Sequence, residues 1–278
     1  MRRTEIVTKE ERKVNMEAII FLIVSFCASV VGAICGIGGG VIIKPVLDLA
    51  GAASVSTISF LSGCTVLSMS CYSVSKSMLA HDSKVDLKTG TPLAIGAAVG
   101  GVLGSQTFKI VKAAFENQNM VGAVQAGCLA FITLLTILYA LFSKKIRLHK
   151  VKNAAVCVVI GLLLGIISSF LGIGGGPINL MVLSFFFSMD TKVAAQNSLY
   201  IILFSQITNL LTTLITGSVP EFEWLALGLM VAGGIGGGMV GRTLYKKMNL
   251  KAVNVLYICL MFIIVSISIY NCVKYLNV

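Results

Sequence analysis

Eight long stretches of this 278-residue sequence contain no charged side chain, and they constrain the fold more than any other feature. They are residues 18–35, 56–75, 91–108, 120–143, 153–189, 193–220, 224–241 and 252–273. A helix needs about 20 apolar residues to cross a bilayer, and nearly all of the stretches reach that length. None alternates polar and apolar residues with a period of two, as lipid-facing strands do. The sequence therefore predicts an all-α integral membrane protein that crosses the cell membrane several times.

The composition supports lipid as the solvent, because 56% of the residues are hydrophobic and only 12% are charged. The net charge of +11 does not require a nucleic-acid partner, since the basic residues lie in short connectors where they orient the chain. All eight cysteines lie inside apolar stretches and are interpreted as small hydrophobic residues. We expect no metal site, no cofactor and no enzymatic centre, because no buried His accompanies the scattered Ser and Cys.

A repeat is visible, because the pentapeptide GIGGG occurs at residues 36–40 and again at residues 172–176. The correspondence continues in the next long segment, where Ser59 matches Ser198. The predicted organisation is a basic tail (residues 1–17), a first transmembrane repeat (18–148) and a second transmembrane repeat (149–278).

Each repeat is predicted to hold five segments, namely a helix that ends at the glycine run, a short helix after it and three long helices. Glycine is a poor helix former, so the run should break the helix. An odd number of segments would invert the second repeat relative to the first. If residues 144–152 are cytoplasmic, alternation places most basic connectors on that side. The same alternation places the basic tail on the other side of the membrane, which contradicts the positive-inside rule. A glycine-run hairpin that fails to span would instead leave the repeats parallel.

The two glycine runs are the candidate binding site. A helix start inside a membrane has amide hydrogens without acceptors and carries a partial positive charge that favours anions. Such a break is tolerated where it lines a cavity or meets a ligand. The alternative is that glycines only let helices pack closely, which fits Gly100, Gly101, Gly104 and residues 233–241 better than the two runs.

Lys44 is the one basic side chain expected inside a membrane segment, four positions beyond Gly40. It could pair with a bound anion, snorkel to an interface or pair with Asp48 at i,i+4. Hydroxyl and amide side chains on the following long helices could complete the site. The predicted substrate-binding residues are Gly36, Gly38, Gly39, Gly40, Lys44, Ser59, Ser62, Gly172, Gly174, Gly175, Gly176, Asn179, Gln196, Asn197, Ser198 and Gln206.

With both glycine runs, the downstream Pro45 and the serine-bearing long helix in place, the chain resembles the sulfite exporter TauE/SafE family. The resemblance covers nearly the whole chain from Ala18 onward. It implies a membrane transporter of sulfite, organosulfonates or related small anions.

The leading hypothesis is therefore a secondary transporter that holds a small anion near the midplane between the two glycine runs. An anion channel of the same fold and a transporter of a different small carboxylate or sulfur compound are the alternatives. The partners are the anion and the lipid bilayer. Coupling to a proton or to sodium, and an oligomeric assembly, stay open at this point.

Overall fold

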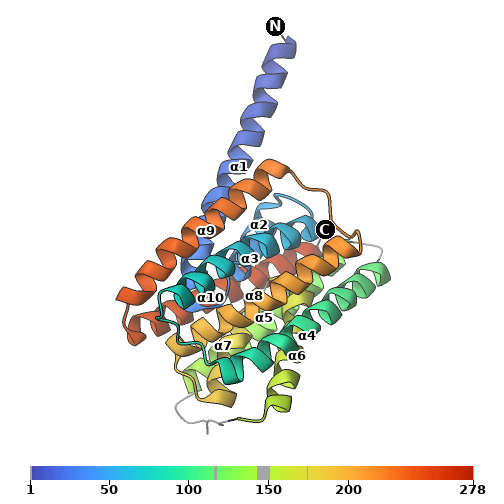
Figure 1. Cartoon of the computed structure of the whole chain (residues 1–278). Coiled ribbons are helices and arrows are strands. Elements are labelled where there is room, and N and C mark those ends of the chain that lie inside the picture. The colour runs from blue at the N-terminus through green and yellow to red at the C-terminus, as the bar shows by residue number, and fades with distance from the viewer. Residues whose placement is uncertain (1, 116–117, 143–150, 174, 278) are drawn as a thin grey trace.

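The computed structural model describes residues 2–115, 118–142, 151–173 and 175–277, with side chains from residue 18 onward apart from Gln118. Gly174, the repeat boundary at Leu148 and most of the basic connector before it lie outside the described residues. The chain folds into helices in the order α1 (Arg2–Cys35), α2 (Gly40–Ala50), α3 (Val55–Leu79), α4 (Leu87–Ala114), α5 (Gln118–Phe142), α6 (Ala154–Leu171), α7 (Pro177–Phe187), α8 (Thr191–Ile215), α9 (Trp224–Lys247) and α10 (Leu250–Leu276) (Figure 1).

The expected all-α membrane architecture is confirmed. Within the described residues, eight helices are long and apolar enough to cross a membrane, namely α3 to α6, α8 to α10 and the part of α1 from Ala18. The helices that follow the glycine runs, α2 and α7, have 11 residues each. At 1.5 Å per residue, each extends about 16 Å, roughly half of the hydrocarbon thickness. α2 and α7 therefore reach only part of the way across.

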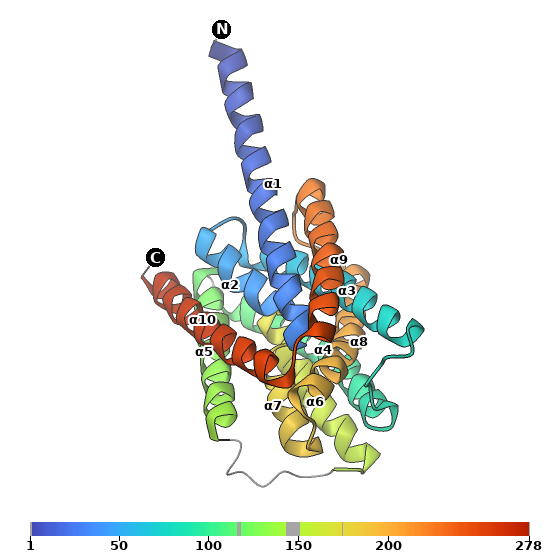
Figure 2. The same ribbon diagram turned by 90° about the vertical axis from the view of Figure 1, so that its left-hand side faces the viewer.

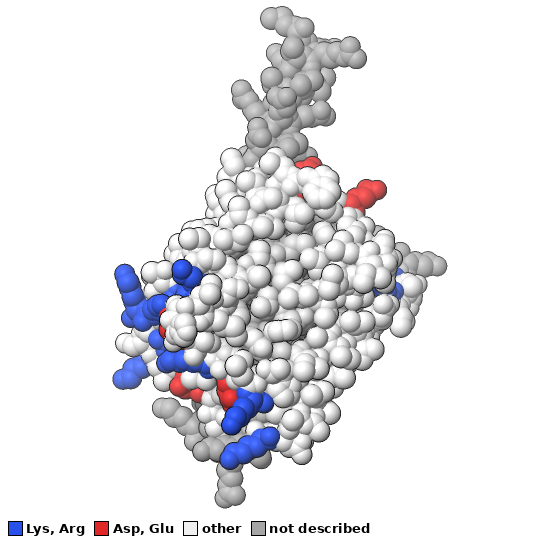
Figure 3. All heavy atoms as spheres, in the orientation of Figure 1, with Lys and Arg blue, Asp and Glu red and all other residues white. Residues whose placement is uncertain are grey.

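Both termini lie on one side of the bundle, opposite to the end of α5 and the start of α6 (Figures 1 and 2). α9 ends and α10 begins at the lower left of Figure 1, and most of the Lys and Arg side chains in view gather there (Figure 3). This end carries Arg242, Lys246 and Lys247. The positive-inside rule assigns such an end to the cytoplasm.

Glycines line the two closest helix crossings. Cβ atoms placed on Gly96, Gly100 and Gly104 of α4 would overlap backbone carbonyls of α6, and those on Gly237 and Gly241 of α9 would overlap backbone carbonyls of α1. Small residues spaced by four let the backbones approach, as in other membrane helix pairs. The close-packing interpretation is confirmed for Gly100, Gly104, Gly237 and Gly241. Each crossing joins one of the first five helices to one of the last five, while the inverted relation between the halves stays a prediction.

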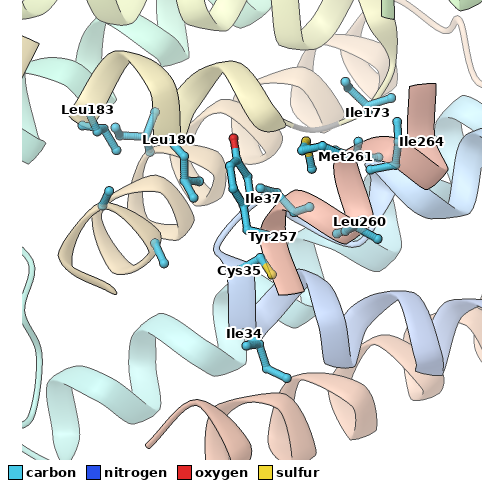
Figure 4. Close-up of a cluster of buried hydrophobic side chains, with 14 of the residues drawn as sticks. Ile34, Cys35, Ile37, Ile173, Leu180, Leu183, Tyr257, Leu260, Met261 and Ile264 are labelled. Atoms are coloured by element: carbon cyan, nitrogen blue, oxygen red, sulfur yellow. The ribbon is translucent and has the colours of Figure 1, made fainter. Parts of the chain in front are cut away.

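The largest hydrophobic cluster lies where the two glycine runs meet α10. Ile37 of the first run and Ile173 of the second are fully or almost fully buried there. Figure 4 shows both side chains in the same cluster as Tyr257 and Met261 of α10. The Tyr257 hydroxyl donates a hydrogen bond of 3.2 Å to the carbonyl of Pro177 at the start of α7. The core therefore holds both runs against one long helix.

Candidate functional site

The structure places the first glycine run (residues 36–40) directly against the second (residues 172–176). A Cβ atom placed on Gly40 would overlap the carbonyl oxygen of Ile173, and one on Gly176 would lie 3.3 Å from Cγ2 of Val41. The chain turns at Gly36 and Gly172, whose φ angles of 70° and 65° lie in the left-handed region that favours glycine. α1 ends just before the first of these residues and α6 just before the second.

The two helix starts meet through apolar side chains. α2 begins at Gly40, and the amides of Ile42 and Ile43 in its first turn donate to the carbonyl of Gly39 over 3.0 and 2.9 Å. Buried Ile37, Val41 and Ile173 fill the contact between the runs. A cavity lies on one side of this contact, and Gly172 is one of the residues that line it.

That space, which we call the Lys112 cavity, has a volume of about 610 Å³. Its buried part includes Gln125, Ser169 and Gln206, and its exposed part includes Lys112 and Ser218. Lys109 lines it too, so two cations and no carboxylate are among the described residues that line it. The cavity favours an anion by charge.

Several polar atoms in or beside the Lys112 cavity have no hydrogen-bond partner. They include Nε2 of Gln206 and the hydroxyls of Ser62, Ser169 and Ser205. Ser62 lies beside the glycine contact, because a Cβ atom on Gly40 would be 2.9 Å from its Oγ. Buried donors are normally satisfied, so these four imply water or a ligand that accepts hydrogen bonds.

Lys44 contacts Ser59, a residue that lines the Lys112 cavity. Its Nζ donates to Ser59 Oγ over 3.2 Å and lies 3.4 Å from Oδ2 of Asp48. The side chain of Lys44 is 4% exposed and that of Asp48 is 6% exposed. The snorkelling interpretation is wrong, because Lys44 is buried. The i,i+4 pair with Asp48 is present.

Comparison with known proteins agrees with a helical membrane protein. Residues 21–268 match the family described as Sulfite exporter TauE/SafE. The chain belongs to this family. A relative in Bacillus subtilis (strain 168), described as "Probable membrane transporter protein YunE", is 25% identical over 265 residues, which cover 86% of this chain and 92% of the relative. No solved structure matches. This TauE/SafE family member is a multi-pass transporter of the cell membrane.

Three predicted residues of the TauE/SafE chain gather beside the second glycine run. Nδ2 of Asn179 donates to Ser198 Oγ over 3.3 Å, and a Cβ atom on Gly175 would lie 3.3 Å from the same nitrogen. Oδ1 of Asn179 has no partner. In the first run, Gly39 lies against Ser29 and Gly36 against Ala195. Gly36 is therefore packed against α8, and Gly39 against α1.

The predicted residues Gln196 and Asn197 lie elsewhere, at the connector between α3 and α4. Gln196 accepts from the backbone N–H of Lys84, and Asn197 accepts from the N–H of Asp86 over 3.1 Å. Asn197 also donates to the carbonyl of Lys84 over 3.2 Å. The structure thus does not bring these two side chains to the Lys112 cavity.

Gln196 lines a second space of about 270 Å³, which we call the Arg242 cavity. Asp82 of the connector accepts two hydrogen bonds from Arg242, of 2.6 and 2.8 Å, and pairs with Lys246. Lys246, together with Arg242, lowers the pKa of Asp82 to about 2. These ion pairs tie the α3–α4 connector to α9.

The sequence did not predict four residues that line the Lys112 cavity, namely Gln125, Ser169, Lys109 and Lys112. Gln125 donates to the carbonyl of Phe170 over 2.6 Å, next to the second glycine run. A lone amide inside the apolar stretch of α5 was the available signal. Among the described residues, no group of His, Cys, Asp and Glu could hold a metal ion.

Proposed function

We propose that the chain is a secondary carrier for a small sulfur-containing anion, such as sulfite or an organosulfonate, bound in the buried part of the Lys112 cavity. The observation that carries the proposal is the pair of unpartnered donors, Gln206 Nε2 and the Ser169 hydroxyl, on residues that line a cavity with two cations. The oxygens of a sulfite or sulfonate group are acceptors without donors, so they complement such a site.

Lys44 supports the proposal, because an ionisable residue buried in a membrane protein is a functional candidate by default. Its ammonium already contacts Ser59, which the cavity exposes to a solute. The family and the relative's printed name support transport, and the family description supports a sulfur compound.

A carrier is favoured over a channel by the separation of the two cavities. The Lys112 and Arg242 cavities share no lining residue. The packed core around Ile37 and Ile173 closes the glycine contact beside the Lys112 cavity. Access from one side at a time is what a rocking pair of half-molecules would provide.

Uptake of radiolabelled sulfite or sulfonate into proteoliposomes tests the proposal. Gln206→Leu should raise the substrate concentration for half-maximal uptake, whereas Gln106→Leu, at an exposed position of α4, should leave it unchanged. Equal uptake by both variants would refute the assignment of the site to the Lys112 cavity. Uptake by the wild type that is no faster than in empty liposomes would refute the carrier function.

A channel predicts single-channel currents and no acceleration of uptake by unlabelled anion on the other side. A carrier predicts the reverse. A thermal-shift screen with sulfite, sulfate, thiosulfate, taurine, sulfoacetate and a simple carboxylate then ranks substrates, because a ligand that binds the native state stabilises it by RT ln(1 + [L]/Kd).

A further inference from the structure

The buried pair of Lys44 and Asp48 is neutral as it stands. Nζ of Lys44 lies 3.4 Å from one carboxylate oxygen, Oδ2, and both side chains are almost fully buried. A buried charge without a partner is strongly destabilising, so neither group can lose the other without replacement.

An anion in the Lys112 cavity would compete with Asp48 for the same ammonium. Lys44 already donates to Ser59, and Ser59 lines that cavity together with Gly172 and Gln206. Once the ammonium pairs with a monovalent anion, the Asp48 carboxylate is left as an uncompensated buried charge. Protonation of Asp48 removes that charge and restores a neutral site.

The surroundings of Asp48 contain the acceptors that a carboxylic acid would need. A void of about 10 Å³ is lined by Lys44, Asp48, Gln125, Ser268 and Asn271, among other residues. Oδ1 of Asp48, Oε1 of Gln125 and Oδ1 of Asn271 have no partner, and all three are acceptors only; the unpartnered Ser268 hydroxyl in the same void can donate to no more than one of them. A proton on Oδ1 of Asp48 would supply a donor to this group of oxygens.

One side chain, that of Gln125, borders both the void and the Lys112 cavity. The void is about large enough for one water molecule. The ionisable groups that face Asp48 are Lys44 on α2 and Tyr275 and Lys274 on α10. Lys274 is engaged with the carbonyl of Leu49 over 3.0 Å, and α3 contributes the uncharged Ser59. Among the described residues, Asp48 is the carboxylate of this group.

We propose that Asp48 takes up one proton with each monovalent anion that pairs with Lys44, so that transport is an electroneutral anion–proton symport. The proton moves from water in the Lys112 cavity to Oδ1 of Asp48, and it leaves to water when the anion is released and Lys44 pairs with Asp48 again. No other reactant is needed. This inference rests on the proposed carrier function and selects the proton over sodium.

Proteoliposomes with a trapped pH-sensitive dye test the coupling, with radiolabelled methanesulfonate as the probe. A sulfonate stays ionised throughout the usable pH range, so a proton that enters with it must be carried by the protein. For the wild type we expect one proton for each anion, no dependence on an imposed potassium diffusion potential and no dependence on sodium. Anion uptake without proton uptake, or uptake driven by the potential, would overturn the coupling and leave the carrier. No anion uptake would overturn both.

Variants then assign the proton to Asp48. Asp48→Asn should retain anion exchange and lose proton uptake to the level of empty liposomes, and its net anion uptake should respond to the imposed potential. Asp48→Glu should keep the coupling, and Glu223→Gln, an exposed carboxylate at the start of α9, should behave as wild type. Proton uptake by Asp48→Asn at the wild-type ratio would refute the assignment. If Asp48→Asn does not fold, the wild-type stoichiometry and the Asp48→Glu variant still decide.

Discussion

Gly40→Ala is the sharpest test of the contact between the two glycine runs. Gly40 is not in a left-handed conformation, so alanine can adopt its backbone angles and the effect is steric. The new methyl group would overlap the carbonyl oxygen of Ile173 and lie 2.9 Å from Ser62 Oγ. The serine can rotate away, but the carbonyl is fixed in the backbone of the other run.

The size of the effect follows from two opposing terms. Overpacking of a closely packed site costs about 1–3 kcal/mol. Alanine recovers up to about 1 kcal/mol through its higher helix propensity. We therefore expect Gly40→Ala to lower the free energy of unfolding by about 1–2 kcal/mol. It should also slow transport, because it displaces the second run, whose Gly172 lines the Lys112 cavity.

Gly228→Ala is the matched control, since nothing lies within 4 Å of a Cβ atom at this interior position of α9. It should raise the free energy of unfolding by about 0.5–1 kcal/mol. Titration of both proteins with a denaturing detergent measures the difference. If the two variants unfold at the same detergent concentration and transport at the same rate, the two runs are not in contact. The arrangement of residues proposed for the site would then be wrong.

Two further predictions concern the charged ends of the molecule. Asp82→Asn should cost about 0.5–1 kcal/mol at pH 6, because it breaks the partly exposed pairs with Arg242 and Lys246. The pKa of Asp82 is lowered from 3.8 to about 2, so the contribution is complete above pH 4 and is lost as the pH falls toward 2. The stability difference between wild type and variant, followed by unfolding titrations, should shrink over that range, and a constant difference would contradict the ion-pair assignment. Lys112→Gln should raise the KM for anion uptake by about 2–5-fold at low ionic strength, with less effect at high salt, because an exposed cation attracts anions through a screened field. Lys251→Gln, at the other end of the bundle, should leave the KM unchanged, and a salt-independent effect at position 112 would argue against attraction.

The sequence by itself determined the kind of protein, because the constraint acts locally. A charge-free stretch of about 20 residues in lipid must satisfy its backbone hydrogen bonds within itself, so its length and composition are sufficient to predict a helix. The glycines of α4 and α9 predicted close helix crossings for the same reason, because the lack of a side chain at a position is visible in the sequence itself. Lys44 could be identified as a candidate because charged residues are rare inside membrane segments.

Only the tertiary structure decided which of the polar residues meet. Hydropathy does not specify which helix packs against which, so the contact of Gly40 with Ile173 and the apolar filling around it could not be read from the chain. The same limit explains Asn197, whose neighbour in sequence, Ser198, contacts Asn179, while Asn197 itself holds the α3–α4 connector. Successive residues of a helix point about 100° apart, and the partners on each face come from distant parts of the chain.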